Sequence, residues 1–145
     1  MHVRALILTS AIVLVAAGCG SGEPATPVAE KPTTTVASDG PDLSGVSFTD
    51  QTGKDEVQVL ARDNTFVTQY TEVSAGTKVT FTNKGQQPHD VLPATKGSFE
   101  GIQPEDFQPG GTGTVTFDEP GDYSYYCSLH GTPTKGMTGT IRVLE

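Results

Sequence analysis

Four side chains of this sequence carry donor atoms that suit a transition metal: His89, Cys127, His130 and Met137. The last three lie within one short stretch with the spacing Cys-x2-His-x6-Met, and His89 lies well upstream. Two imidazoles and a thiolate in one plane, with a weakly bound thioether on the axis, form the donor set of copper electron-transfer sites. Imidazole and thiolate suit Cu(II) and soft sulfur suits Cu(I), so this set predicts one-electron chemistry.

Taken singly, each of these residues has a more ordinary role. A lone histidine is usually structural or on the surface, a lone buried cysteine is usually inert packing, and a methionine beside a strand is usually core. Cys-x2-His also occurs in zinc sites, but structural zinc sites favour more cysteines and no methionine. The four residues together, in this order, predict one mononuclear copper ion.

Three local signatures surround these residues: 75–83 followed by Pro88-His89-Asp90-Val91, then 120–127, and then 136–143. Together they resemble the cupredoxin family, the plastocyanin- and pseudoazurin-like type 1 blue copper proteins, over roughly residues 57–143. The resemblance implies an all-β fold, a two-sheet Greek-key sandwich or barrel. It also implies one type 1 copper that cycles between Cu(II) and Cu(I), in a carrier that catalyses no reaction of its own.

The resemblance also assigns roles to the four donor residues. His89 corresponds to the buried equatorial histidine, Cys127 to the thiolate ligand, His130 to the histidine at the solvent edge and Met137 to the axial ligand. His130 would then be the port for electrons. The small or apolar residues 131–133 beside it are compatible with transient docking of a redox donor and a redox acceptor.

Two positions depart from the family pattern. Asp90 stands where relatives often have asparagine, and we expect its carboxylate to accept a hydrogen bond from the Ser128 N–H and brace the ligand loop. Its negative charge near copper should favour Cu(II) and lower the potential. The second departure is the longer spacing between His130 and Met137, six residues instead of four, for which Gly131 and Pro133 would permit a tight reversal.

Short strands with turns between them predict the all-β fold independently. Alternating apolar residues or β-formers occur over 57–61, 66–70, 72–73, 78–83, 112–117, 123–127 and 138–143. No stretch shows the spacing of apolar residues that is typical of an amphipathic helix. The stretch 94–111 has no strand pattern either, and we expect a short helical turn there, near 103–106. Tyr123 and Tyr125 alternate before Cys127, and we interpret them as structural, with a tyrosine corner, rather than as an electron relay.

The N-terminus predicts export. Residues 1–18 have a short basic start and an apolar run too short to span a bilayer, which is typical of a signal peptide. The run ends at Ala16-Ala17-Gly18-Cys19, which resembles a bacterial lipobox and predicts acylation of Cys19. We expect a Pro-, Thr- and Ser-rich disordered tether over 19–44 and the copper domain over 45–145. The protein would be a lipoprotein on the outer side of the cell membrane, facing the periplasm or the exterior; soluble secretion is the alternative.

Charge and composition narrow the function. The net charge is −8, which argues against binding nucleic acid and against adhesion to anionic lipid. With Cys19 acylated, Cys127 has no disulfide partner, and a bound metal would protect it. A second copper site would need several more histidines, so we expect a monomeric electron carrier and no enzyme. Two alternatives stay open: copper capture or delivery, and a fold of this type that binds without metal.

Overall fold

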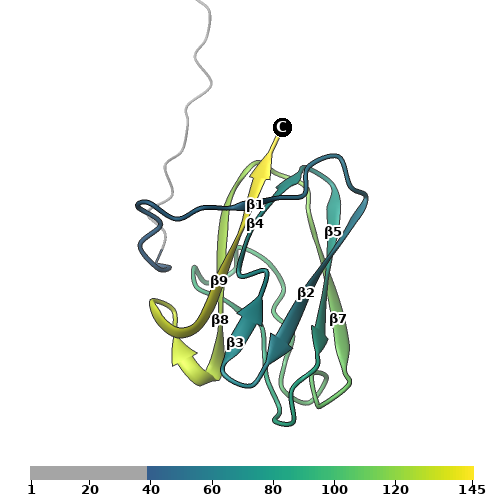
Figure 1. Cartoon of the computed structure of the whole chain (residues 1–145), viewed down its shortest axis with the longest axis vertical. Coiled ribbons are helices and arrows are strands. Elements are labelled where there is room, and N and C mark those ends of the chain that lie inside the picture. Colours follow the sequence, from purple (N-terminus) through teal and green to yellow (C-terminus); the bar gives the residue numbers. More distant parts are fainter. Residues whose placement is uncertain (1–38) are drawn as a thin grey trace, which may run out of the picture. The chain divides into compact units, whose positions relative to one another are not determined.

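The computed structural model describes residues 39–145, which form two β-sheets packed face to face (Figure 1). The five-stranded sheet has the order β1-β4-β9-β8-β6, with bounds Thr49–Asp50, Tyr70–Ser74, Lys135–Leu144, Gly121–Thr132 and Leu92–Pro93. The four-stranded sheet has the order β3-β2-β5-β7, with bounds Thr65–Val67, Glu56–Arg62, Thr77–Asn83 and Thr112–Phe117. The described residues contain no helix, so the predicted all-β, two-sheet fold is confirmed.

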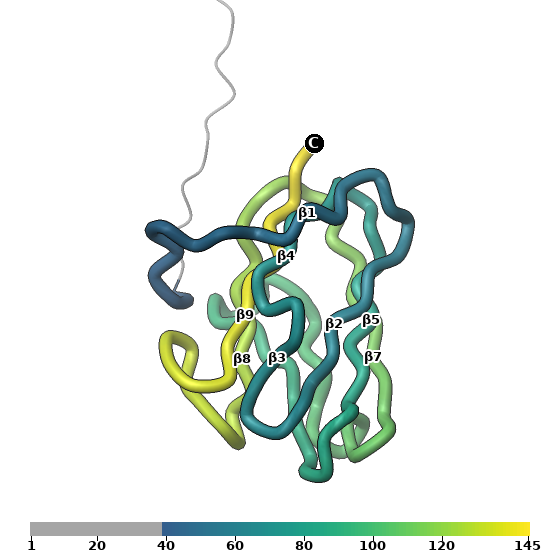
Figure 2. Tube along the Cα trace, in the orientation of Figure 1, coloured from purple at the N-terminus to yellow at the C-terminus, as the bar shows by residue number. Residues whose placement is uncertain are grey.

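Alternation along the strands produces the two-layer arrangement. In β2, Val57, Val59 and Ala61 are buried and the residues between them are more exposed, because successive side chains of a strand point to opposite faces. In β5, Val79 and Phe81 lie on the same inner face. Figure 2 shows β2, β5 and β7 together on one side of the molecule and β8 and β9 on the other. The core therefore lies between the sheets.

The aromatic centre of the core joins both sheets. The rings of Phe66, Phe81 and Tyr125 meet edge to face, with the Tyr125 centroid 4.9 Å from that of Phe66 and 5.2 Å from that of Phe81. Tyr125 is fully buried and its hydroxyl donates to the Gln69 carbonyl at 3.3 Å. Gly139 in β9 permits this packing, since a Cβ there would lie 2.4 Å from the Tyr125 ring.

Tyr123 forms the predicted tyrosine corner. Its hydroxyl donates to the Glu119 carbonyl, four residues earlier, at 2.9 Å, and so fixes the turn that leads into β8. The structural interpretation of both tyrosines is therefore supported, because each ring packs in or against the core and each hydroxyl has a backbone acceptor.

Two details differ from the sequence-based prediction, and a third agrees with it. The stretch 66–70 is not one extended segment, because Thr68 has a positive φ of 64° and the chain passes there from β3 in one sheet to β4 in the other. The two-residue strands β1 and β6 were not predicted, since two residues carry no period. The short turn expected near 103–106 is present, closed by hydrogen bonds from Asp106 N–H to Gln103 O and from Phe107 N–H to Pro104 O.

The predicted signal segment 1–18, Cys19 and most of the predicted tether lie outside the described residues. The last part of that tether, residues 39–44, contacts the domain: Pro41 is buried and the Asp39 N–H donates to Thr95 Oγ1 at 3.4 Å. Within 39–145 the chain has no apolar helix of the length that crossing a membrane requires.

Candidate metal centre

The donor residues come from two separate parts of the chain. His89 lies in the connection between β5 and β6, whereas Cys127 and His130 lie in β8 and Met137 lies near the start of β9. The connection that carries His89 leaves β5 in the four-stranded sheet and leads into β6, which pairs with β8 in the five-stranded sheet, Leu92 opposite Tyr126. The site therefore lies where the β5–β6 connection meets β8, and the pairing of β6 with β8 helps to hold the two ligand segments together.

Asn83, at the end of β5, folds the connection that carries His89. Its buried side-chain amide donates to the carbonyls of Gln87 at 2.9 Å and Phe107 at 2.8 Å, and its Oδ1 accepts from the Gly85 N–H at 2.9 Å. The backbone N–H of His89 also donates to the Phe107 carbonyl, at 3.3 Å. Sequence reasoning missed Asn83. Its position at a strand end, followed by a glycine-containing turn, was the available signal.

Three of the four predicted donor residues converge on one point. The Nδ1 atoms of His89 and His130 lie 3.1 Å apart, and Cys127 Sγ lies 3.6 Å from the former and 3.4 Å from the latter. His89 and Cys127 are completely buried, whereas His130 is partly exposed. One imidazole is thus enclosed by protein and the other reaches the surface, as the resemblance implied.

These separations suit a single metal ion. Bonds from a metal to imidazole nitrogen and thiolate sulfur are about 2.0 and 2.3 Å long, so donors around a common ion lie roughly 3 to 4 Å apart. All three donor pairs fall in this range. A soft thiolate combined with two imidazoles is a set that copper accepts in both oxidation states. The residues present therefore fit a type 1 copper.

Met137 is close in sequence to His130 and is buried, with 1% of its surface exposed. It directly follows Gly136, which pairs with Gly131 across the β8–β9 hairpin, and the strand register shifts between Tyr126 and Gly131. This register shift is a β-bulge in the segment that contains Cys127 and His130, and such bulges redirect side chains. The axial role of Met137 stays a prediction.

The longer spacing between His130 and Met137 forms the tip of a β-hairpin rather than an open loop. Thr132 pairs with Lys135, so the chain reverses within two residues, and β8 continues through the ligand segment. Gly136 has a φ of 87°, and a Cβ at this position would lie 2.6 Å from the His130 carbonyl oxygen. The predicted tight reversal is present, and the extra residues extend the hairpin.

Asp90 connects the two ligand-bearing segments. It is almost fully buried, and its Oδ1 accepts from the Ser128 N–H at 2.7 Å while its Oδ2 accepts from the Ser128 hydroxyl. The bond from the Ser128 N–H is the contact that the sequence predicted. It fixes the segment after His89 to the residue after Cys127, so the two segments cannot move apart without breaking hydrogen bonds to a buried carboxylate.

Burial sets the protonation preferences of the donors. It lowers the pKa of His89, and the neighbouring His130 acts in the same direction, although Asp63 and Asp90 oppose both. The neutral imidazole, which is the form that binds metals, is therefore favoured. Burial also raises the pKa of the Cys127 thiol, opposed by the backbone N–H groups of Asp90 and Leu129. A metal must displace that thiol proton when it binds.

The second ring nitrogen of His89 is also distinctive. Nε2 is buried and has no hydrogen-bond partner within residues 39–145. It faces Gly85, where a Cβ would approach it to 3.1 Å. The ring therefore presents Nδ1 to Cys127 and His130 and keeps Nε2 on the protein side, so only one of its nitrogens is available to a metal in the cluster.

Comparison with known proteins agrees with this geometry. Residues 54–144 match the plastocyanin/azurin family of copper-binding proteins. A plastocyanin from Solanum crispum is 39% identical over an alignment of 80 residues, and the match covers 49% of this chain and 79% of that protein. Amicyanin from Paracoccus versutus superposes with a TM-score of 0.51 at 27% identity, over 76% of this chain and 96% of amicyanin.

An enzyme also contains a similar domain. A Cu-containing nitrite reductase from Thermus scotoductus superposes with a TM-score of 0.52 at 30% identity, over 62% of this chain but only 22% of the reductase. The family match and the convergent imidazole and thiol groups agree on one type 1 copper as the cofactor. With a match across more than half of its length, the chain belongs to the plastocyanin/azurin family of copper-binding proteins.

Proposed function

We propose that this protein is an exported one-electron carrier that shuttles between two redox proteins, with copper held by His89, Cys127, His130 and Met137. The observation that supports it best is the convergence of two imidazole Nδ1 atoms and one thiol sulfur within 3.6 Å of one another. Bound copper supplies a one-electron couple, Cu(II)/Cu(I), at this point. The chain's own residues supply a rigid, mostly dry and partly accessible site.

Rigidity favours a carrier over a copper-delivery protein. His89 is held by the loop that Asn83 organises, and the Cys127 segment is held by Asp90 and by the pairing of β8 with β9. The positions of donor atoms supported in this way change little when an electron arrives, which keeps the reorganisation energy small. A delivery protein must instead release its metal, and two fully buried ligands hinder release.

The histidine count favours a carrier over a self-contained enzyme. The whole sequence has three histidines, and His2 lies in the predicted signal segment, so only His89 and His130 remain for metal binding. A second copper site would need further imidazoles. The resemblance to a nitrite reductase covers a fifth of that enzyme, so it is a likeness of one domain.

The first prediction concerns the copper site itself. Cu(II) added to the purified protein should produce a strong thiolate-to-copper absorption near roughly 600 nm, bleached by ascorbate and restored by ferricyanide. Cys127→Ser should abolish this band, because it removes the only thiolate of the cluster. A protein without any charge-transfer band would rule out the electron carrier. Reversible colour with rapid loss of copper to a chelator would instead favour copper delivery.

The second prediction concerns Asp90. Its carboxylate lies close enough to Cys127 to disfavour the thiolate, so its charge should likewise stabilise the more positive copper state. Asp90→Asn keeps a carbonyl for the Ser128 N–H but removes the charge. Redox titration should show a higher midpoint potential, with a shift on the order of 1 kcal/mol or about 40 mV.

The matched control for this charge is Asp106→Asn. Asp106 is exposed and lies in the turn after β6. This substitution should leave the midpoint potential nearly unchanged. An unchanged or lower potential in Asp90→Asn, with the visible band intact, would contradict the electrostatic role of Asp90.

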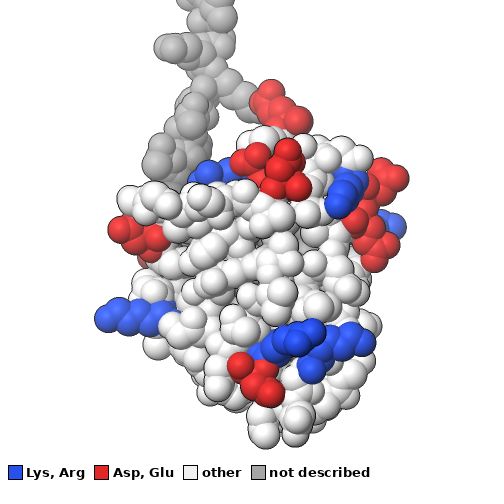
Figure 3. All heavy atoms as spheres, in the orientation of Figure 1, with Lys and Arg blue, Asp and Glu red and all other residues white. Residues whose placement is uncertain are grey.

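We place the docking surface for redox partners at the exposed edge of His130. The neighbouring Leu129 is the most exposed of the large hydrophobic residues in the described part of the chain, at 52%, and Gly131 and Pro133 are partly exposed beside it. An apolar surface around a partly exposed ligand allows close approach without the cost of removing charged groups from water. Elsewhere the surface carries both signs of charge, as the face in Figure 3 shows.

The third prediction tests this surface with the protein as its own partner. Leu129→Glu should lower the rate of electron self-exchange between reduced and oxidised copies by about tenfold, because it sets like charges against each other at the contact. Leu144→Glu is the control: Leu144 is 40% exposed, and it lies seven residues beyond Met137, about 23 Å along β9. Equal slowing in both variants would place the contact elsewhere.

The fourth prediction concerns location. We propose export through the N-terminal signal and anchoring through an acylated Cys19, which leaves the copper domain on a tether at the membrane surface. In cells, the unaltered protein should fractionate with membranes, and Cys19→Ser should move it to the soluble fraction with its copper spectrum unchanged. Soluble secretion of the unaltered protein would overturn the anchor but leave the electron carrier intact.

A further inference from the structure

The ring nitrogen of His89 that faces away from the metal cluster needs a hydrogen-bond acceptor. His89 presents Nδ1 to Cys127 and His130, so a metal in the cluster binds Nδ1. A neutral imidazole with Nδ1 on a metal carries its proton on Nε2, which makes Nε2–H a donor. This nitrogen is buried and has no partner within residues 39–145. A buried N–H without an acceptor costs free energy, so the surroundings of Nε2 have to supply one.

Gly85 leaves a small space beside this nitrogen. A Cβ on Gly85 would lie 3.1 Å from His89 Nε2, 2.7 Å from Asp63 Oδ1 and 3.2 Å from the Asp63 backbone nitrogen. Three polar atoms therefore surround the side of Gly85 that any other residue would fill. Gly85 does not have a positive φ, so glycine suits this position because of the space it leaves and not because of its backbone conformation.

The Asp63 carboxylate is held next to this space. Asp63 directly follows β2, and its Oδ1 accepts a hydrogen bond from the Gln86 N–H at 2.9 Å. That bond joins the turn after β2 to the loop that carries His89. Burial lowers the pKa of His89, and of the two carboxylates that oppose this, Asp63 acts more strongly than Asp90. Both oxygens of Asp90 already accept hydrogen bonds elsewhere, so Asp63 is the carboxylate left for Nε2.

We propose that Asp63 is a positioning residue for His89 and acts through one water molecule held beside Gly85. The water accepts a hydrogen bond from His89 Nε2–H and donates one to Asp63 Oδ1, and the Asp63 N–H is within reach as a further donor. Three polar partners are typical of a buried water. The contact keeps the proton on Nε2, fixes the plane of the ring and leaves Nδ1 for the metal. This inference rests on His89 as a copper ligand, which is part of the proposed function.

The charge of Asp63 gives the contact a second effect. A carboxylate that is hydrogen-bonded to a ligating imidazole makes the imidazole a stronger donor, which stabilises the more positive metal ion. Asp63 is exposed, and solvent screens much of its charge, so its effect on the potential should be smaller than that of the buried Asp90. The turn after β2 carries no ligand, yet it influences both the orientation of His89 and the potential.

The test observes the Nε2 proton of His89 directly. In the reduced, copper-loaded protein with ¹⁵N-labelled histidines, this proton should give a resonance that exchanges slowly with water. Asp63→Asn keeps a carbonyl for the Gln86 N–H but removes the carboxylate. The proton should then exchange about tenfold faster, because a charge-assisted contact is lost, and redox titration should show a higher midpoint potential. An unchanged exchange rate, with the visible copper band intact, would overturn the role of Asp63.

Asp55→Asn is the matched control. Asp55 directly precedes β2 as Asp63 directly follows it, and both are exposed. The eight residue steps between them correspond to about 26 Å along the strand. This variant should therefore change neither the exchange rate nor the potential. Equal changes in Asp55→Asn and Asp63→Asn would show that only net charge acts on the site, and would overturn the contact.

Gly85→Ala tests the water molecule without changing any charge. Its methyl group would fill the space between Asp63 Oδ1 and His89 Nε2 and exclude the water, so the His89 proton should again exchange faster. Slow exchange in Gly85→Ala, with the visible band intact, would overturn the water-mediated contact. If Gly85→Ala loses the band, Asp63→Asn decides alone. Absence of the band from the unaltered protein would overturn the proposed function itself, and the band is recorded before any variant is compared.

Discussion

A single buried carboxylate joins the two segments on which the metal centre depends. Asp90 follows His89, and it accepts hydrogen bonds from the backbone and the hydroxyl of Ser128, which follows Cys127. Donor atoms separated by 38 residues must be held to within a few ångströms of each other. A buried charge is stable only when it is well paired, so the Asp90 contact is costly to break and effective as a clamp.

The remaining architecture supports this clamp from both sides. The aromatic centre formed by Phe66, Phe81 and Tyr125 fixes the spacing between the sheets directly behind the ligand strand, since Tyr125 is two residues before Cys127. Asn83 ties the end of β5 to the turn at Phe107 and so closes the loop that ends at His89. Each ligand segment is thus held by groups that are themselves buried, which limits how far any donor atom can move.

Much of this arrangement could be predicted from the sequence because it depends on local patterns. Alternation over 57–61 and 112–117 indicates strands, and the Cys-x2-His spacing with an upstream histidine indicates the ligands. Even the bond from Ser128 to Asp90 could be predicted by resemblance, since only the residue type had changed. The contact from Asn83 to the Phe107 carbonyl could not, because Phe107 lies 24 residues away and its position is known only once the chain has folded.

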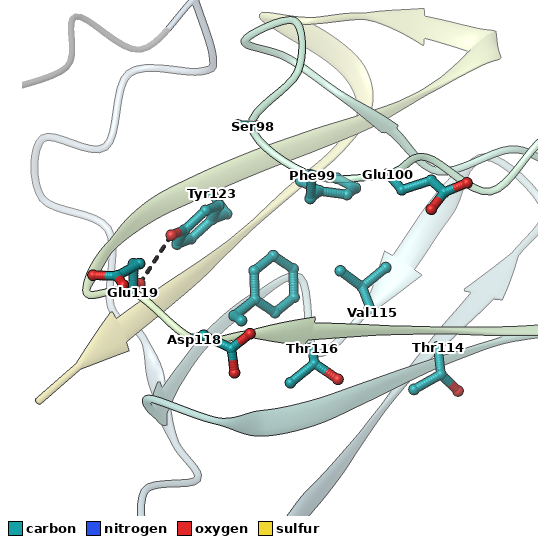
Figure 4. Close-up of a pocket in the computed structure, with 10 residues that line it drawn as sticks. Ser98, Phe99, Glu100, Thr114, Val115, Thr116, Asp118, Glu119 and Tyr123 are labelled. Atoms are coloured by element: carbon teal, nitrogen blue, oxygen red, sulfur yellow. Dashed lines mark hydrogen bonds between the residues drawn. The ribbon is translucent and has the colours of Figure 1, made fainter.

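Other features of the structure could not be predicted from the sequence, for a related reason. The crossing between sheets at Thr68 needs a positive φ in a residue type that rarely adopts one, so nothing local marks it. A surface cleft beside β7 gathers Phe99, Phe117 and Tyr123 from three segments (Figure 4), and each alone is an ordinary core residue. Because β8 contributes to both the cleft and the metal centre, one stiff strand carries an acidic, aromatic surface at its start and metal ligands toward its end.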